Sequence, residues 1–170
     1  MITPGKDAGE VRQDTWEKMY QESWKGHITE QAFCHPAKFS KALIFNIIQH
    51  AIDEGFVKKG DTVLDCFAGV ALGALPLMLH GINYIGIELE EKFIQLGQNN
   101  VDLWTQRYGH LPDFGQALLL CGDSRQLATL LQGHADCVVA SPPFLNARSG
   151  TTATSENVNG GPCAERVHSV

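Results

Sequence analysis

Dense runs of lysine and arginine are absent from the sequence, and this bounds the partners that the chain can hold. Its 13 basic residues are outnumbered by 19 acidic residues, which gives a formal net charge of -6 at pH 7. Proteins that bind the phosphate backbone tightly concentrate positive charge in a patch or stripe. We therefore do not expect this chain by itself to bind nucleic acid strongly, whereas a small positive face, or a basic region elsewhere in a longer polypeptide, stays open.

Paired cysteines and long apolar runs are also missing. The five cysteines, none close to another at the spacing of a metal site, are Cys34, Cys66, Cys121, Cys137 and Cys163. We expect no metal site, and an odd number of scattered thiols favours a reducing cytoplasm. No apolar stretch approaches the length of a membrane span, and the first ten residues lack the apolar core of a secretory signal. The expectation is a soluble, cytoplasmic protein that does not contact a membrane.

What the sequence does contain is an alternation of helix-like and strand-like segments. The predicted helices are 39–52, 71–80, 90–108 and 124–132, and the predicted strands are 62–66, 83–88, 117–123 and 136–140. Strands that alternate with helices in this way are typical of βαβ units. The sequence therefore predicts an α/β fold with a mostly parallel sheet and helices on both faces.

The flanks of this alternating region differ from it in composition. Residues 1–32 are polar with scattered aromatics and no sustained period, and we interpret them as an N-terminal arm or surface extension. Residues 149–170 are rich in serine, threonine, asparagine and glycine, which predicts a flexible polar tail. The remaining range, 33–148, is interpreted as the domain that carries the chemistry.

A polar residue stands at the carboxyl end of each predicted strand. These residues are Asp65, Glu88, Asp123 and Ser141, in the order of the strands. In open α/β sheets, ligands bind beyond the carboxyl ends of the strands. The coincidence of four such residues predicts a ligand site at that edge of the sheet.

The turn after the first predicted strand, "DCFAGVALG", contains Gly69 and Gly73. These glycines let the chain turn tightly into a helix whose N-terminal amides face a ligand. Glu88, about twenty residues further on, is placed to accept hydrogen bonds from both ribose hydroxyls of a nucleoside. Asp123 either accepts from an adenine amino group or caps the short helix that follows it, and the two roles are compatible. The glycine spacing differs from G-x-G-x-x-G and no Walker lysine follows, so a nucleoside without phosphates fits better than a nucleotide.

Together with "VVASPPF", residues 138–144, this turn resembles the signatures of the S-adenosylmethionine-dependent amino-methyltransferases of DNA. Their patterns are a D-P-F-x-G-x-G turn and a [DNS]-P-P-[YFW] catalytic loop. The stretch "FCHPAKFSKALIFNII", residues 33–48, resembles the segment that in this family precedes the first strand and contacts the methionine end of the cofactor. The order of the motifs resembles the family's gamma arrangement, and the resemblance covers about residues 33–146.

The resemblance implies a Rossmann-like fold and methyl transfer to an exocyclic amino group, cytosine N4 or adenine N6, of a base flipped out of DNA, as in restriction–modification. It implies that the cofactor is bound by Phe33, His35, Lys38, Asp65, Phe67, Gly69, Gly73, Glu88 and Asp123. In the catalytic loop, Ser141 and the Pro142 carbonyl would accept hydrogen bonds from the amino group. Pro142 and Pro143 would hold the loop rigid, and Phe144 would stack on the base.

Alternatives stay open for several of these residues. His35 is either a cofactor contact or a loop histidine with a satisfied hydrogen bond. Lys38 either neutralises the cofactor carboxylate or opens the helix at its solvated side. Phe33 is either a cofactor wall or part of the core, and the Ser-Pro-Pro-Phe loop is either catalytic or a rigid surface turn with Phe144 packed inward.

The sequence departs from the family pattern in three respects. Cys66 stands where the family usually has proline, and Ala71 stands where a second close glycine is common, so we expect its methyl group to crowd the methionine arm of the cofactor. The family's sheet has seven strands, and only four are predicted here. We therefore expect a C-terminally truncated chain or one piece of a split enzyme, whose missing recognition region or complementing chain would complete it. The other hypotheses are a non-catalytic cofactor-binding remnant and an amino-methyltransferase of RNA or protein.

Overall fold

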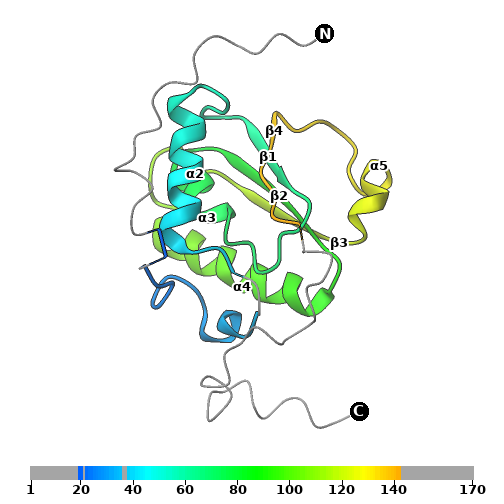
Figure 1. The fold of residues 1–170 in the computed structure, drawn as a ribbon, viewed down its shortest axis with the longest axis horizontal. Coiled ribbons are helices and arrows are strands. Elements are labelled where there is room, and N and C mark those ends of the chain that lie inside the picture. Colours follow the sequence, from blue (N-terminus) through cyan, green and yellow to red (C-terminus); the bar gives the residue numbers. More distant parts are fainter. Residues whose placement is uncertain (1–18, 21, 36–37, 143–170) are drawn as a thin grey trace.

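The computed structural model describes residues 19, 20, 22–35 and 38–142, and within these ranges it contains one four-stranded sheet (Figure 1). The strands are β1 Thr62–Asp65, β2 Asn83–Glu88, β3 Ala117–Cys121 and β4 Cys137–Val138. They lie in the order β3-β2-β1-β4, and every neighbouring pair is parallel. The carboxyl ends of all four strands therefore meet at one edge, as the sequence predicts.

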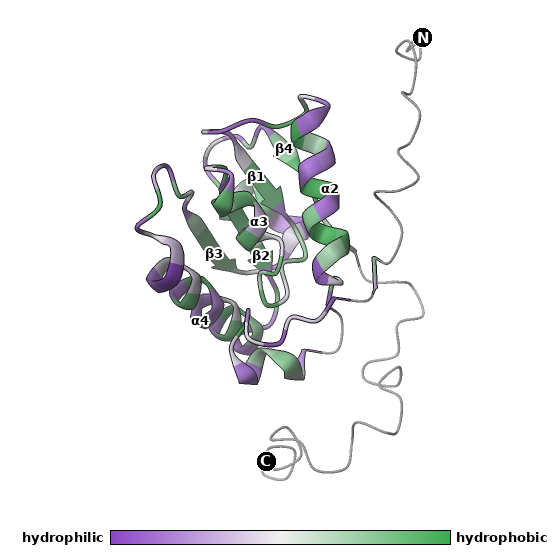
Figure 2. Ribbon diagram, turned by 90° about the vertical axis from the view of Figure 1, so that its left-hand side faces the viewer, coloured by the Kyte–Doolittle hydropathy of each residue, from purple (hydrophilic) through white to green (hydrophobic). Residues whose placement is uncertain are grey.

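The longer helices cover one face of this sheet. In chain order the helical elements are η1 Glu30–Cys34, α2 Lys41–Asp53, α3 Ala74–Leu79, α4 Glu91–Tyr108, η2 Ser124–Gln126 and α5 Leu127–Leu130. Figure 2 shows the mostly apolar α3 in front of the strands, with α2 to one side of it and α4 below. The short α5 lies on the other side of the strands (Figure 1). Helices on both faces confirm the expected class, although the two layers are very unequal.

The hydrophobic core lies between the strands and the α2–α4 layer. Val63, Tyr84 and Ala117 form one row across the sheet, because Val63 pairs with Tyr84 and Tyr84 pairs with Ala117. Val63 and Tyr84 are buried within the core cluster, and five of the six residues of α3 are buried as well. An all-apolar short helix is stable only when it is enclosed, which explains why α3 occupies the centre of this layer.

The opposite face of the sheet is apolar but largely open in the described part of the chain. Its central row runs through Val138, Leu64, Ile85 and Leu118, which are register partners. Successive residues of a strand point to opposite faces, so these side chains point away from the core row beside them. Leu64 is 4% exposed, whereas Leu118 and Val138 are 50% and 60% exposed at the two sides of the row. No residue of α5 is buried, so this helix covers little of the row.

The described residues of the range expected to be an arm, 1–32, differ from that expectation. Trp24, Ile28 and Ala32 are buried in the main core cluster. Trp24 Nε1 donates to the Phe39 carbonyl at 2.7 Å, and Trp104 Nε1 donates to the His27 carbonyl at 2.6 Å. Residues 1–32 are polar overall, but these three apolar residues are spaced four apart, which is the spacing of a buried helical stripe. The division of the chain into three domains otherwise stays a prediction.

Several predicted elements are shorter in the structure than in the sequence analysis. The predicted helix 71–80 begins only at Ala74, because Gly69 and Ala71 have φ values of +54° and +62° that no α-helix accommodates. The predicted strand 136–140 is reduced to two paired residues, and the helix 124–132 divides into η2 and α5. The element order itself is as predicted.

Gly86 offers a test of how tightly the sheet packs on the glycine turn. A Cβ at this position would lie 2.7 Å from Tyr84 Cε1 and 2.8 Å from Ala68 Cβ. We expect Gly86→Ala to lower the free energy of unfolding by about 1–3 kcal/mol, the cost of overpacking a core. Urea unfolding followed by circular dichroism measures this change.

Gly73→Ala is the matched control, because its Cβ would meet Tyr84 Cε2 at an ordinary 3.6 Å and its φ is -66°. We expect this variant to unfold within about 0.5 kcal/mol of the parent chain, as substitutions outside the destabilising mechanisms usually do. Equal losses for the two variants would contradict the packing described here.

Candidate functional site

The turn between β1 and α3 is built around the buried carboxylate of Asp65. This side chain is 3% exposed; its Oδ1 accepts from the Phe67 amide at 2.9 Å, and its Oδ2 accepts from the Tyr84 hydroxyl at 3.2 Å. The first bond fixes the direction in which the chain leaves β1. The second ties this carboxylate to the neighbouring strand β2, so the start of the turn is held from two sides.

Glu88 joins the end of β2 to the same turn. Its Oε2 accepts from the Gly69 amide at 3.0 Å, and its Oε1 accepts from the Glu90 amide at 3.0 Å. A backbone bond from the Ala68 amide to the Ile87 carbonyl, 2.9 Å long, lies beside them. A carboxylate has about four acceptor positions, so Glu88 keeps the capacity to bind ligand hydroxyls while it holds the turn. The two acidic residues that the sequence analysis placed at one edge are therefore brought together by the fold.

The environment of Asp65 changes the affinity of its carboxylate for protons. Burial, and to a smaller degree the nearby charge of Glu88, raises the pKa of Asp65 to about 6 against the opposing hydrogen bonds from Phe67 and Tyr84. Burial also raises the pKa of Tyr84 well above its ordinary value, so this hydroxyl stays protonated and donates. Burial, followed by the charge of Asp65, raises the pKa of the Cys66 thiol. A thiol with a raised pKa is a poor nucleophile.

Ala71 adopts a left-handed backbone conformation that is typical of glycine. Its φ is +62°, a region that L-residues other than asparagine and aspartate rarely adopt, and its side chain is fully buried. A Cβ built on Gly97 of α4 would lie 3.4 Å from the Ala71 methyl group, so that methyl group faces α4. The expected crowding of the cofactor by this methyl group is therefore not what the structure shows. The small residue at Gly97 makes the room that the methyl group takes.

His35 lies directly over the glycine turn. A Cβ on Gly69 would come within 3.0 Å of His35 Cε1 and 3.1 Å of Nε2. The imidazole also contacts Phe93 of α4 edge-on, with the ring centroids 4.3 Å apart. The structure thus brings His35 to the turn, although the segments are more than thirty residues apart in the sequence.

Lys38 and Phe33 are placed differently from His35. The Lys38 ammonium donates to the Phe33 carbonyl at 3.0 Å and also to the His35 carbonyl. It therefore caps the last turn of η1, and burial lowers the pKa of this ammonium. The Phe33 side chain is 40% exposed, so it is not enclosed by the core. Contact of either residue with a cofactor stays a prediction.

Asp123 caps the short helix after β3. Its Oδ1 accepts from the Arg125 amide at 3.0 Å, and the Arg125 guanidinium donates to both carboxylate oxygens, at 2.5 Å in its shortest contact with Oδ2. These hydrogen bonds lower the pKa of Asp123 to about 2, so the carboxylate is charged at neutral pH. The capping role left open by the sequence is present, and the role toward adenine stays a prediction.

The catalytic loop predicted from the sequence is only partly within the described residues. The Val139 amide donates to the Leu64 carbonyl at 3.0 Å, which carries the chain along β1 toward the carboxyl edge. Ser141 and Pro142 follow and are exposed. Pro143 and Phe144 lie outside the described residues.

Sequence reasoning missed four residues around this edge. Tyr84 and Asn100 are buried polar partners of the turn, and Leu89 and Phe93 are apolar residues beside Glu88 and His35, Leu89 being 67% exposed. The position of Leu89 directly after Glu88 was a signal that could have found it. The positions of Tyr84 and Asn100 give no such signal, because both fall within ordinary strand and helix patterns.

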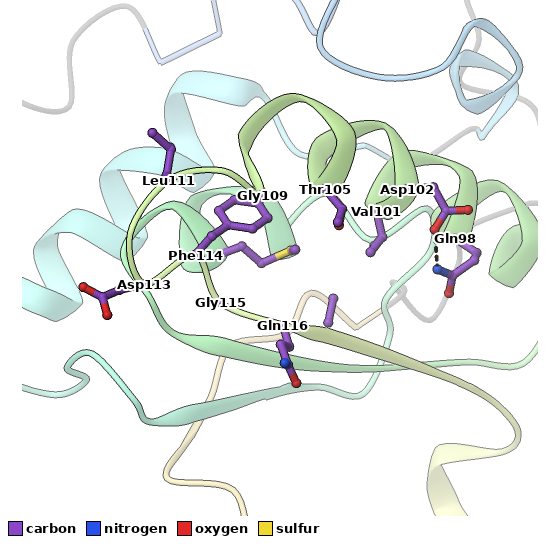
Figure 3. A pocket seen from close by; sticks show the side chains of 12 residues that line it. Gln98, Val101, Asp102, Thr105, Gly109, Leu111, Asp113, Phe114, Gly115 and Gln116 are labelled. Carbon is purple, nitrogen blue, oxygen red and sulfur yellow. Dashed lines mark hydrogen bonds between the residues drawn. The ribbon is translucent and has the colours of Figure 1, made fainter.

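A separate cavity of about 610 Å³ lies at the other end of β3 (Figure 3). Its walls come from α4, including Gln98 and Asp102, and from the loop around Phe114 that leads into the strand. The Gln98 amide donates to Asp102 at 2.8 Å, so these polar groups satisfy each other. Because the cavity lies at the amino end of the strand, it is not part of the candidate site.

Within the described residues, no three histidine, cysteine, aspartate or glutamate side chains come together in a way that could hold a metal ion. None of the helices in the described ranges is both long enough and apolar enough to cross a bilayer.

Residues 3–99 match the family of DNA methylases. The chain belongs to this DNA methylase family. It is 43% identical over 68 residues to the Type II methyltransferase M.BglI of Bacillus subtilis, a match that covers 40% of this chain and 18% of that protein. A second match, 46% identical over 46 residues, is to the 23S rRNA (uracil(1939)-C(5))-methyltransferase RlmD of Marinomonas posidonica and covers 27% of this chain and 10% of that protein. The matched part is thus less than a fifth of either relative.

Two solved structures align with part of this chain. TrmN from Thermus thermophilus is 20% identical, with a TM-score of 0.49 over 66% of this chain and 31% of its own. Magnesium protoporphyrin IX methyltransferase from Synechocystis PCC 6803, with bound SAH, is 17% identical, with a TM-score of 0.42 over 75% of this chain and 51% of its own. The parallel sheet and the family membership together confirm the Rossmann-like α/β class.

The raised pKa of Asp65 predicts how the stability of the fold depends on pH. Because the folded-state pKa is about 6 against an ordinary 3.8, the folded state binds this proton more tightly than the unfolded state. The stability that protonation contributes is present below about pH 4 and is lost as the pH rises through about 6. Asp65→Asn keeps the shape without the charge, so we expect it to be more stable than the parent chain at pH 7.5, by up to about 3 kcal/mol.

Urea midpoints of both chains between pH 4 and pH 8 measure this effect. The difference between them should grow across the window from pH 4 to pH 6.5 and then level off. A difference that does not change with pH would show that Asp65 does not titrate in this window.

Proposed function

We propose that the chain carries the cofactor-binding and catalytic region of a site-specific DNA methyltransferase. The methyl group would pass from S-adenosylmethionine to the exocyclic amino group of a base, cytosine N4 or adenine N6. Membership of the DNA methylase family supports this proposal. The observation that carries it is the hydrogen bond between the Gly69 amide and Glu88. This bond holds a carboxylate with unused acceptor positions against the glycine turn at the sheet edge.

The residues present at this edge suit the chemistry of S-adenosylmethionine. The Glu88 carboxylate binds the two ribose hydroxyls with its remaining acceptor positions. Leu89 and Phe67, which are 67% and 41% exposed, offer apolar surface to the adenine ring. Asp123, charged at neutral pH, accepts from the adenine amino group after the exposed Arg125 side chain releases one carboxylate oxygen, because the Arg125 bonds occupy both oxygens in this structure.

In this proposal the methionine end of the cofactor lies on the side of the turn opposite the ribose and adenine. His35 lies over Gly69, and Gly69 and Gly73 keep the chain close enough for its amides to face the ligand. Phe33 and Lys38 flank His35 in the same segment. Asp65 holds the turn through the Phe67 amide rather than through a contact with the ligand. When bound, S-adenosylmethionine supplies an electrophilic methyl group on a sulfonium.

The loop after β4 prepares the amino group that is methylated. An exocyclic amine is conjugated with its ring and is a weak nucleophile. The Ser141 hydroxyl and the Pro142 carbonyl accept its hydrogen bonds and draw it toward a tetrahedral shape, an effect that fixed acceptors produce well. In this proposal Pro143 holds the loop rigid and Phe144 stacks on the flipped base.

DNA is the proposed partner, and the charge of this chain indicates that it does not hold DNA alone. With a net charge of -6, the chain needs a basic recognition region, in a longer polypeptide or in a complementing chain. We place the enzyme in the cytoplasm, where its substrate and its thiols in reduced form are found together. The match to an rRNA methyltransferase makes RNA the second candidate substrate.

Glu88 gives the first test, by isothermal titration of the chain with S-adenosylmethionine. We expect Glu88→Gln to raise the dissociation constant at least tenfold, because an amide replaces one of the two acceptor oxygens. Glu91→Gln, the same loss of charge in the first turn of α4, is the control and should stay within twofold of the parent chain. A parent chain that binds no S-adenosylmethionine at millimolar concentration would overturn the proposal.

Ser141 gives the second test, by transfer of a tritiated methyl group to unmethylated plasmid DNA. We expect Ser141→Ala to lose methyl transfer by about a hundredfold, as for removal of one preorganised hydrogen-bonding group, while it keeps the affinity for S-adenosylmethionine within twofold. Thr129→Ala, which removes an exposed hydroxyl from α5, is the control and should transfer normally.

Nucleoside analysis of the product distinguishes N4-methylcytosine from N6-methyladenine. Transfer to ribosomal RNA but not to DNA would favour the second candidate. Cofactor binding without transfer to either would establish a cofactor-binding chain that is not catalytic by itself.

A further inference from the structure

Asn100, in the middle of α4, is a fully buried polar side chain that the proposed chemistry does not use. Its Nδ2 donates to the Val70 carbonyl at 3.0 Å. Its Oδ1 accepts from the Thr29 amide at 2.9 Å and from the Thr29 hydroxyl at 3.0 Å. Its exposed fraction is 0%, so these partners replace water completely. A buried amide in such a position is costly unless every bond is made, and here the bonds join two distant segments.

The first of these segments is the strained part of the glycine turn. Val70 lies between Gly69 and Ala71, whose φ values are +54° and +62°. The bond from Asn100 fixes the direction of the Val70 carbonyl and hence the orientation of the peptide between Val70 and Ala71. A non-glycine residue at positive φ persists only where its surroundings hold it there. The Asn100 side chain holds this peptide from the carbonyl side, and a 2.8 Å bond from the Ala71 amide to the Ala68 carbonyl holds it from the amide side.

The second segment carries His35. Thr29 is the N-cap residue of η1, and His35 follows the last residue of that helix. The His35 imidazole returns to the turn and lies over Gly69. The contacts therefore form a closed ring: the turn, Asn100, Thr29, η1, His35 and the turn again. Asn100 thus links both surfaces between which the methionine end of the cofactor is proposed to lie, and Phe93 of the same helix supports the His35 ring directly.

We propose that Asn100 is a positioning residue for S-adenosylmethionine, which aligns the Gly69 amide and the His35 ring before the ligand binds. This inference rests on the proposed function. Pre-aligned groups lower the ordering cost of binding, so a loss of alignment weakens affinity even in a chain that remains folded. The role belongs to the hydrogen bonds of Asn100 and not to the packing of α4 in general.

The test compares Asn100→Ala with Trp104→Phe by isothermal titration with S-adenosylmethionine. Trp104→Phe is the matched control, because it removes another bond from α4 to the same segment, the 2.6 Å bond from Trp104 Nε1 to the His27 carbonyl, without touching the turn. Both variants are titrated at a temperature at which circular dichroism shows them folded. We expect a dissociation constant at least tenfold higher for Asn100→Ala and within twofold of the parent chain for Trp104→Phe.

Thr29→Val provides a milder variant for the case in which Asn100→Ala does not fold. It removes only the hydroxyl bond to Asn100, and we expect about a threefold higher dissociation constant. Folded variants of Asn100 or Thr29 that bind as tightly as the parent chain would overturn the inference alone. A parent chain that does not bind S-adenosylmethionine would overturn the proposed function, and this inference with it. If Trp104→Phe weakened the binding of S-adenosylmethionine equally, Asn100 would have only a general packing role. This result would also overturn the inference.

Discussion

The hydrogen bond between the Gly69 amide and the Glu88 carboxylate is the constraint on which the rest of the site depends. It joins the turn after β1 to the end of β2 over a distance of 3.0 Å, and it gives an acidic side chain a defined position at the sheet edge. Asp65, buried behind the turn, holds the same loop through the Phe67 amide. Burial, and to a smaller degree the charge of Glu88, raises the pKa of this buried carboxyl. Glu88 itself is half-buried and keeps acceptor positions that its two bonds to backbone amides do not use.

The turn illustrates how a departure from a family pattern is accommodated. Ala71 adopts a positive φ that favours glycine, and its methyl group packs toward Gly97 on α4. Gly97 leaves the space on α4 that the Ala71 methyl group occupies. The bond from Asn100 to the Val70 carbonyl then holds the strained peptide in place. The strained backbone is confined to the turn, and contacts with α4 hold it in place.

The sheet has two faces of unequal character in the described part of the chain. One is closed by α2, α3 and α4 over a continuous core, whereas the row from Val138 to Leu118 is apolar and half open. Hydrophobic rows on both faces are typical of strands in parallel sheets, which are normally covered on both sides. The ligand edge does not depend on the open face, because its contacts come from the covered side and from the strand ends.

The order of elements and the acidic residues at strand ends could be predicted from the sequence, because both follow from local patterns. Apolar periodicity distinguishes helix from strand, and parallel strands bring their carboxyl ends together. Asp65 and Glu88 were therefore placed correctly at one edge. The buried stripe of Trp24, Ile28 and Ala32 was missed, because it lies in a segment whose composition is polar overall. Tyr84 and Asn100 were missed as well, because their roles depend on hydrogen bonds to residues distant in the sequence and not on their neighbours along the chain.

The sequence by itself determined the fold class, the family and the position of Asp65 and Glu88 at one edge of the sheet. Only the tertiary structure decided which groups hold that edge: Tyr84 on Asp65, Asn100 between Thr29 and Val70, and His35 over Gly69. It also decided the direction of the Ala71 methyl group and the engagement of Lys38 with backbone carbonyls. The physical reason is the separation along the chain of the residues that interact. Periodicity and turn chemistry act between near neighbours, whereas these hydrogen bonds and contacts join residues far apart in the chain and exist only after the core has closed.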